Sequence, residues 1–214
     1  NGTIPAAVYT RGGAARWEVN PERIRLVEQT AETIGTLIKN KVRPLDIVTK
    51  EAIDNAFILD LAMGGSTNTV LHTLALACEA GIRYPLKRIN QLADLPPNVC
   101  KVSPPRPEVH LEDVHRAGGI AAILKAVHQD GRAPLNLGLK TCTGTLRETV
   151  FAAPDADQDV IRTGAKAFSP RGGLAVLYGN IAPDGAVVKT AGVEKDMMQF
   201  EGTAKCYSSQ EEAL

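Results

Sequence analysis

Two glycines followed by three polar residues, from Gly64 to Asn68, form the part of the sequence best suited to binding a ligand. Glycine allows a tight turn, and the first N–H groups of a helix, together with its dipole, favour an anion such as a carboxylate. The candidate residues for binding a substrate or anion are therefore Gly65, Ser66, Thr67 and Asn68. The alternative is that Ser66 or Thr67 only caps the helix, while the glycines allow close packing.

Three further groups of polar residues could take part in chemistry. His72 lies one helical turn after Asn68, where it could reach a ligand or serve as a hydrogen-bonded core histidine. The run from Glu112 to Arg116 could do acid–base work, or it could be a solvated helix start with local ion pairs. Arg171-Gly172-Gly173 could hold an anion, or it could be a glycine turn that leads into a strand.

The cysteines do not have the spacing of a metal site or an iron–sulfur site. Cys78, Cys100, Cys142 and Cys206 are far apart in the sequence and form no CxxC pair. We expect free thiols in a reducing cytoplasm, with Cys78 in the core because it lies on an apolar helical stripe. The chain also lacks dinucleotide-binding, P-loop and nucleophile-elbow motifs, so the sequence assigns it no catalytic residue and no metal ligand.

The composition indicates a globular protein without a bias towards charged partners. The chain has 214 residues, of which 44% are hydrophobic and 22% charged, and 24 basic residues balance 24 acidic ones. A net charge of zero gives no general attraction to nucleic acid or to anionic membranes. The apolar runs are too short for a membrane helix, and no secretory pattern follows Asn1, so we expect a cytoplasmic protein.

The first two-thirds of the chain is predicted to be mainly helical. Asn20-Pro21-Glu22 predicts the start of a helix that ends before Pro44, and Thr49 predicts the start of a second. The expected inner face of the second helix consists of Ile53, Ala56 and Phe57. A third helix follows Gly64-Gly65, and its broad apolar face predicts packing inside the domain. That face consists of Val70, Leu71, Leu74, Ala75 and Cys78.

The later part of the chain is predicted to change from helix to strand. A helical region from Glu112 to His128 is interrupted at Gly118-Gly119. Strands at 174–178 and 186–190 are joined through Pro183-Asp184-Gly185, and a helix start at the end of the chain follows Ser208-Ser209. We therefore expect a first domain at 1–150, a linker at 151–171 and an incomplete second domain at 172–214.

Several sequence blocks resemble the dihydroxy-acid dehydratases, and they occur in that family's order. The longest is AIDNAFILDLAMGGSTNTVLHTLALACEAGI, from Ala52 to Ile82. The others are VRPLDIVTKEA, VHLEDVHRAGG, GGLAVLYGNIAPDGAVVKTAGV and SSQEEAL. Sugar-acid dehydratases share the fold, but NTVLH and EDVHRAGG resemble more closely the enzyme of branched-chain amino-acid synthesis. The chain thus resembles an internal piece of such an enzyme.

This resemblance implies an α/β fold: the helix-rich C-terminal part of the family's N-terminal α/β domain, followed by the first strands of a β-barrel-like swivelling domain. It implies dehydration of a 2,3-dihydroxy acid to a 2-keto acid by a full-length, homo-oligomeric enzyme, expected to be a dimer. An iron–sulfur cluster, Mg²⁺ and a base serine would do this chemistry.

The family motifs that carry the cluster cysteines, the magnesium ligands and the base serine do not occur in this chain. We therefore expect no bound cofactor and no activity in the isolated chain. Two alternatives remain: a non-catalytic module that binds a ligand or partner through the Gly64–Asn68 turn, and a piece of a sugar-acid dehydratase.

Overall fold

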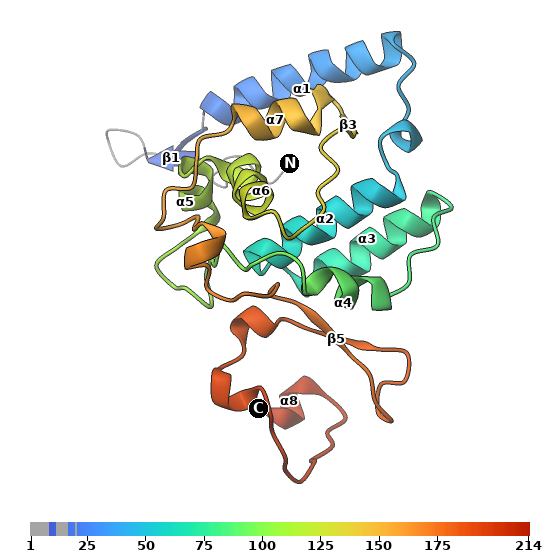
Figure 1. Ribbon diagram of the computed structural model, residues 1–214, viewed down its shortest axis with the longest axis vertical. Helices are drawn as coiled ribbons and strands as arrows, with labels where there is room; N and C mark the ends of the chain where they lie inside the picture. The colour runs from blue at the N-terminus through green and yellow to red at the C-terminus, as the bar shows by residue number, and fades with distance from the viewer. Residues whose placement is uncertain (1–8, 12–16, 20) are drawn as a thin grey trace.

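The computed structural model describes residues 9–11, 17–19 and 21–214, and Figure 1 shows their arrangement. The predicted cap Asn20 lies outside the described residues, as does most of the loop expected before it. The helices are α1 (Pro21–Lys39), α2 (Lys50–Met63), α3 (Thr67–Glu79), α4 (Lys87–Ala93), α5 (Leu111–Arg116), α6 (Gly119–Asp130), α7 (Leu146–Ala152) and α8 (Gln210–Ala213). Short 3₁₀ turns occur at Pro44–Asp46, Gly164–Lys166, Thr190–Gly192 and Lys195–Met197.

The described strands form three separate antiparallel pairs of two strands each. They are β1 (Tyr9–Arg11) with β2 (Trp17–Val19), β3 (Lys140–Thr141) with β4 (Gly144–Thr145), and β5 (Ala175–Leu177) with β6 (Ala186–Val188). The protein is therefore helix-rich with few short strands, which is compatible with the predicted α/β class. The predicted hairpin near the end is confirmed, with Val176 opposite Val187 in its register.

Helix α2 begins and ends where its sequence predicts. The Thr49 side chain accepts a hydrogen bond from the Ala52 N–H at 3.2 Å, which satisfies one of the unpaired donors of the first turn. At the other end Gly64 adopts the left-handed conformation, with φ of +58°. Glycine adopts this conformation without the steric cost of a Cβ atom.

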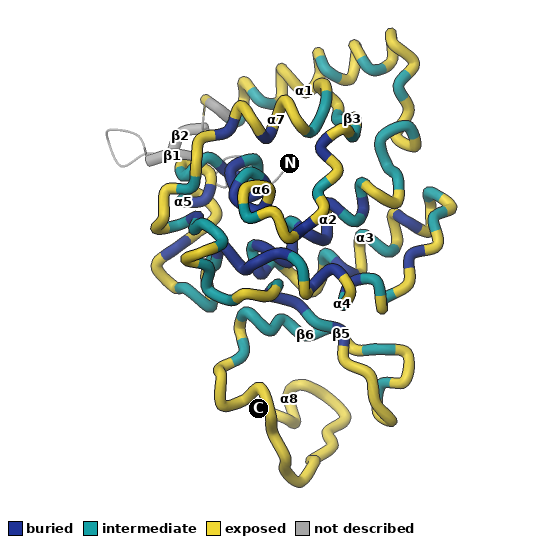
Figure 2. The backbone as a smooth tube through the Cα atoms, viewed as in Figure 1, coloured by how far each residue is buried: buried dark blue, intermediate teal, exposed yellow. Residues whose placement is uncertain are grey.

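The core forms around α2, which packs between α4 and α6. Figure 2 shows the buried residues concentrated on these helices. The side chains of Phe57, Ile58 and Leu61 are completely buried, as are those of Ile89 in α4 and Ile123 in α6. Burying each of these large apolar side chains contributes about 1.5–3 kcal/mol to folding, which makes α2 the centre of the structure.

The predicted inner faces of α2 and α3 are correct only in part. Ile53 and Phe57 are buried, but Ala56 is exposed and borders a pocket described below. In α3, Val70 is buried whereas Leu71 is 66% exposed. Cys78, expected in the core, is also exposed. The reason is that α3 packs against α2 and β6 along one side only, so apolar spacing did not identify which side is covered.

Helix α1 also carries apolar residues at helical spacing that remain exposed. Figure 1 shows this helix along the upper edge of the molecule, away from α2. Its exposed residues include Ile24, Val27, Ile34 and Ile38. The helix was predicted correctly, but the described part of the chain does not cover its apolar stripe.

Three other predicted helix boundaries agree with the structure. Gly118 and Gly119 separate α5 from α6, with φ values of +105° and +69°. Gly131 caps the end of α6 in the left-handed conformation. At the end of the chain, the Ser209 hydroxyl accepts a hydrogen bond from the Glu212 N–H at 3.3 Å and caps α8. None of the helices in the described ranges is both long enough and apolar enough to cross a membrane.

Leu61 and Leu71 provide a matched test of this core. The Leu61→Ala substitution leaves a cavity beside Phe57, so we expect the free energy of unfolding to fall by about 2–5 kcal/mol. Leu71→Ala should change it by less than about 0.5 kcal/mol because Leu71 is largely exposed. Urea denaturation measures both values, and equal losses would contradict the central position of α2.

Candidate ligand-binding site

The C-terminal end of α2 is buried, and its carbonyl groups receive hydrogen bonds from distant parts of the chain. The Leu61 carbonyl accepts from the Gly173 N–H at 2.8 Å, and the Ala62 carbonyl accepts from the Val99 N–H at 2.8 Å. The Asn98 side chain is 1% exposed, and its Nδ2 atom donates to the Ala62 carbonyl at 3.2 Å. Besides the local bond from the Gly64 N–H to the Leu61 carbonyl at 3.4 Å, these bonds supply the donors that the last carbonyls of the helix need.

Gly172 and Gly173, which follow Arg171, allow the backbone to approach the C-terminal end of α2 closely. A Cβ atom on Gly172 would lie 2.7 Å from the Leu61 Cβ, and one on Gly173 would lie 2.6 Å from the Gly64 Cα. Side chains at these two positions would therefore push the backbone away from the end of α2. Of the two interpretations of Arg171-Gly172-Gly173, the turn that leads into β5 is the one that the structure supports. The Arg171 side chain pairs with Asp94 at the surface.

The Gly64–Asn68 turn connects α2 to α3 and is capped by Ser66. The Ser66 hydroxyl accepts a hydrogen bond from the Asn68 N–H at 3.2 Å, so Ser66 rather than Thr67 is the cap. Thr67 is the first residue of α3, and the side chains of Thr67 and Asn68 are exposed. The capping function predicted for this motif is thus confirmed, and two of its polar side chains remain open to solvent.

Asp60 lies directly beneath this turn, although no sequence motif pointed to it. Its side chain is 7% exposed. Its Oδ1 atom accepts hydrogen bonds from the Ser66 N–H at 3.3 Å and the Thr69 hydroxyl at 3.2 Å. A Cβ atom on Gly65 would lie only 1.7 Å from the same Oδ1 atom. A side chain at position 65 would therefore collide with this buried carboxyl group, which explains the glycine. The sequence signal that could have identified Asp60 is its place as the single acidic residue within the apolar run FILDLAM.

Burial raises the pKa of Asp60, because removal from water disfavours the charged carboxylate. The hydrogen bonds from Ser66 and Thr69 and the positive charge of Lys189 act in the opposite direction but do not cancel this effect. No donor in the described residues reaches the buried Oδ2 atom. Asp60 thus has an unused acceptor in an environment that disfavours its own charged form.

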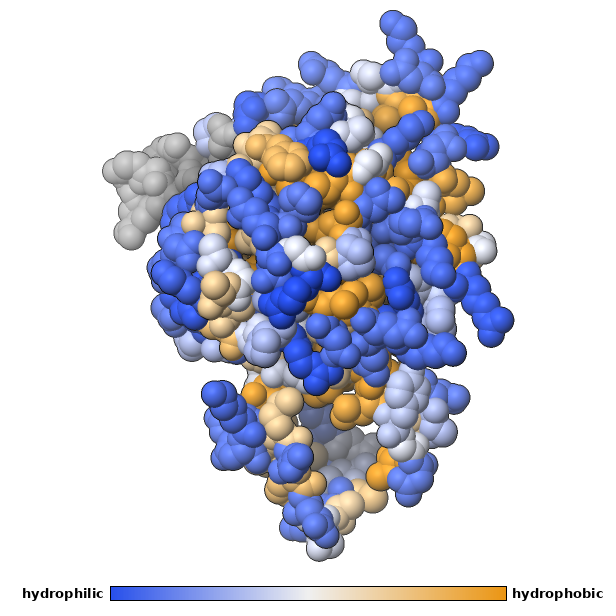
Figure 3. Space-filling model, in the orientation of Figure 1, coloured by the Kyte–Doolittle hydropathy of each residue, from blue (hydrophilic) through white to orange (hydrophobic). Residues whose placement is uncertain are grey.

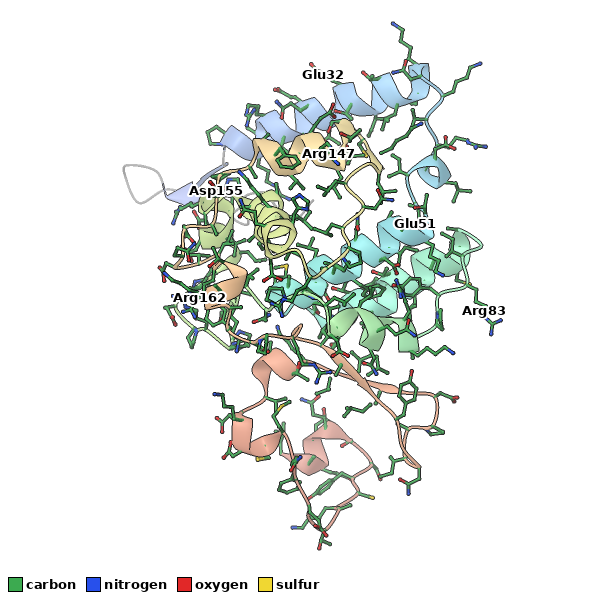
Figure 4. The ribbon with its side chains drawn as sticks, in the orientation of Figure 1. Glu32, Glu51, Arg83, Arg147, Asp155 and Arg162 are labelled. Carbon is green, nitrogen blue, oxygen red and sulfur yellow. The ribbon has the colours of Figure 1, made fainter. Side chains whose placement is uncertain are left out.

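A pocket of about 860 Å³ lies beside this turn. Its polar lining residues are Asp60, Ser66, Thr69, Ser103 and His110, and its apolar ones are Ala56, Leu59, Met63, Val102, Leu111 and Ile120. Such a lining suits a small ligand with an apolar body and hydroxyl groups that donate hydrogen bonds. Asp60 is buried, whereas charged residues such as Glu32 and Arg83 lie at the periphery of the molecule (Figure 4).

The other histidines and acids have simpler explanations. His72 is exposed and does not line the pocket, so it is not a core histidine. Arg116 pairs with Glu112 at 2.6 Å and with Asp113 at 3.6 Å, which is the predicted local ion pairing at a helix start. His110, which belongs to no recognised sequence motif, is the histidine that lines the pocket.

The free thiols lie on separate parts of the structure. Cys100 is buried, and burial raises the pKa of its thiol to about 12, so it is a poor nucleophile and metal ligand. Cys78, Cys142 and Cys206 are exposed. Within the described ranges, no three His, Cys, Asp or Glu side chains come together in a group that could hold a metal ion.

A helix-rich domain with a half-apolar pocket and converging polar groups is typical of proteins that bind small molecules. Comparison with known families gives a more specific assignment. The N-terminal domain of the dihydroxy-acid/6-phosphogluconate dehydratases matches residues 9–149, and the C-terminal domain of the same family matches residues 159–214. The chain belongs to this family.

Curated relatives support the same assignment. The chain is similar to the dihydroxy-acid dehydratase of Aquifex aeolicus, with 47% identity over 92% of this chain. It is 46% identical to the dihydroxy-acid dehydratase of Caldanaerobacter subterraneus over 100% of this chain. These matches cover only 35% and 36% of the two relatives, so the chain spans about a third of their length.

The contact between Gly65 and Asp60 can be tested by substitution. In Gly65→Ala the new methyl group displaces the Asp60 carboxyl from Ser66 and Thr69, so we expect a loss of about 1–3 kcal/mol in the free energy of unfolding. Gly35→Ala, in the open middle of α1, should be neutral or slightly stabilising. In an Asp60→Ala background the cost of Gly65→Ala should nearly disappear. Equal costs in both backgrounds would contradict this contact.

The raised pKa of Asp60 predicts a pH dependence of stability. A raised pKa means that the folded state binds the proton more tightly than the unfolded state, so stability is lost as pH rises through the folded-state pKa. Asp60→Asn keeps an oxygen acceptor but removes the charge. We expect the stability of this variant relative to the unsubstituted chain to increase from pH 3 to pH 8 in urea denaturation.

Asp184→Asn in the exposed loop between β5 and β6 removes the same charge and serves as the control. If the stability difference for Asp60→Asn does not vary with pH, or varies only as it does in the control, burial does not raise the pKa of Asp60.

Proposed function

We propose that this chain is part of a hydro-lyase that dehydrates 2,3-dihydroxy acids, of the 2,3-dihydroxyisovalerate type, to 2-keto acids in branched-chain amino-acid synthesis. The observation that carries this proposal is the continuous similarity to relatives named dihydroxy-acid dehydratase. The matched part is about a third of those enzymes, so the activity belongs to a longer polypeptide, and the isolated chain is inactive.

In this proposal Gly65, Ser66, Thr67 and Asn68 contact the substrate or support its site. The adjacent pocket supports such a role, because it combines an apolar wall with hydroxyl and carboxyl groups. Asp60 affects which part of the substrate would face the turn. A buried carboxyl beneath the turn favours a hydroxyl donor at this position, because a hydroxyl could satisfy the Oδ2 atom that has no donor in the described residues.

We further propose the family's domain arrangement: residues 1–150 belong to an N-terminal α/β domain, 151–171 form the linker, and 172–214 begin a β-barrel-like swivelling domain. The β5–β6 hairpin supplies strands suited to such a sheet. The complete enzyme is proposed to be a cytoplasmic homodimer. The exposed apolar stripe of α1 is a surface that a larger assembly would cover.

The family's iron–sulfur cluster and Mg²⁺ do not fit the residues described here. The cysteines lie apart, and no acidic or histidine cluster of ligating size occurs in the described ranges. In the complete enzyme these groups would have to be held by residues outside this chain. The part played by this chain is therefore binding and support of the site.

A chimeric enzyme tests the proposed function. The 214 residues would replace the matching segment of the Aquifex aeolicus dehydratase, and keto-acid formation from 2,3-dihydroxyisovalerate would be measured. We expect the chimera to keep activity within about tenfold of the parent enzyme, because the inserted segment is 47% identical to the one that it replaces and carries the same family domains. The isolated chain, assayed with iron, sulfide and Mg²⁺, should show none.

Two results would contradict the proposal. Keto acid formed by the isolated chain would disprove the dependence on a longer polypeptide. A folded chimera that dehydrates a sugar acid but not 2,3-dihydroxyisovalerate would instead support the sugar-acid dehydratase alternative.

A further inference from the structure

The apolar residues of the 860 Å³ pocket are aligned along α2. Ala56, Leu59 and Met63 line this pocket, whereas Phe57 and Leu61 of the same helix are buried in the core. Residues three, four and seven positions apart share one face of a helix, so the first three form a continuous strip, here called the α2 stripe. Figure 3 shows apolar residues exposed at several places on the surface, and the alignment distinguishes the α2 stripe from such scattered residues.

Other elements complete the apolar lining of this pocket. Val102 comes from the connecting stretch, Leu111 from α5 and Ile120 from α6. Val102 and Ile120 also pack against the core, as do Leu59 and Met63 of the α2 stripe. These contacts hold the side chains in place, so the lining is largely formed before a ligand enters. A preformed lining lowers the entropic cost of binding.

Polar groups gather at the end of the pocket where α2 turns into α3. Ser66 and Thr69 line the pocket there. The Asp60 carboxyl accepts hydrogen bonds from the Ser66 N–H and the Thr69 hydroxyl, so it belongs to the same end. The other polar lining residues, Ser103 and His110, come from the stretch before α5. A ligand with a polar end and an apolar chain can therefore place the polar end at the turn and extend the chain along α2.

The α2 stripe is longer than the alkyl part of the proposed substrate. From Ala56 to Met63 it spans about 10 Å, because each helical residue rises about 1.5 Å. An extended alkyl chain advances about 1.2 Å per carbon, so a chain of about eight carbons would cover this length. The two methyl groups of 2,3-dihydroxyisovalerate would cover only a small part of it.

We propose that this pocket accepts an alkyl chain of about eight carbons, so that the complete enzyme also dehydrates long-chain aliphatic 2,3-dihydroxy acids. The polar end of the ligand lies at the turn, and its chain packs along α2 from Met63 towards Ala56. The small side chain of Ala56 leaves the far end of the α2 stripe open. The inference rests on the proposed dehydratase function and extends the class of substrate that the same site takes.

A series of straight-chain 2,3-dihydroxy acids measures the usable length of the α2 stripe. Titration calorimetry of the 214-residue chain would cover alkyl chains from about two to about twelve carbons. The Kd should fall about fourfold for each added methylene, because each one is removed from water. It should stop falling near about eight carbons, where the chain reaches the end of the stripe. An affinity that does not depend on chain length would overturn the proposal.

Two matched variants show whether the chain lies along α2. Ala56→Leu fills the far end of the α2 stripe, so the affinity should stop rising at a chain that is shorter by about two carbons. Ala75→Leu makes the same change at an exposed position of α3 outside the pocket and should leave the limit where it was. Ala56 is also exposed, so both variants should keep the fold, which thermal unfolding would check. If Ala56→Leu does not shorten the limit, the proposed position of the chain is wrong.

The chimeric dehydratase tests the same range in a complete enzyme. We expect its kcat/KM for 2,3-dihydroxydecanoate to lie within about tenfold of that for 2,3-dihydroxyisovalerate. In the chimera, Ala56→Leu should lower the ratio of the long-chain to the short-chain kcat/KM by at least about tenfold, and Ala75→Leu should not change it.

The outcomes separate this inference from the proposed function. A chimera that dehydrates 2,3-dihydroxyisovalerate but not 2,3-dihydroxydecanoate would overturn the inference and leave the proposed function intact, because the rest of the polypeptide would then fill the α2 stripe. A chimera that dehydrates neither acid would contradict the proposed function. The chain-length series and the Ala56→Leu variant of the 214-residue chain would then decide by themselves whether the pocket takes a long alkyl chain.

Discussion

The structure depends on satisfying the buried carbonyl groups at the C-terminal end of α2. Leu61 is completely buried, so its carbonyl cannot turn to water and must receive a donor from the protein. Gly173 supplies that donor, and Asn98 and the backbone after it serve the Ala62 carbonyl. The helical part, the connecting stretch and the segment that leads to β5 therefore meet at one place. The pocket beside the Gly64–Asn68 turn lies next to it, on the side of Asp60.

Local signals in the sequence predicted α1, α2, α3, α5, α6 and α8, but α4 and α7 were not predicted. The caps at Thr49 and the break at Gly118-Gly119 depend on interactions within a few residues, and both are confirmed. The covered face of α3 was not predictable, because apolar residues surround much of that helix and only tertiary contacts decide which are buried. Leu71 and Cys78 are exposed for this reason. The domain boundaries and the substrate-binding role of the turn stay predictions.

In the candidate site, too, the features that depend on neighbouring residues were predicted, and those that depend on tertiary contacts were not. The glycines and the Ser66 cap were visible in the sequence, because a cap needs only its own helix. Asp60 was missed because its significance depends on the chain turning back so that Ser66 and Thr69 donate to it. A motif that suggested anion binding thus lies over a buried carboxyl group with an unused acceptor, which favours a ligand that donates a hydrogen bond.

The bond between Gly173 and Leu61 also has a consequence for synthesis on the ribosome. Domains generally begin to fold while the chain is still emerging, N-terminal part first. Helix α2 emerges early, whereas the amide that completes its end follows only after α7 and the long connecting stretch. Until that amide emerges, the nascent chain carries a helix end that cannot yet be buried at full stability. Closing this long loop is therefore a late step in its folding.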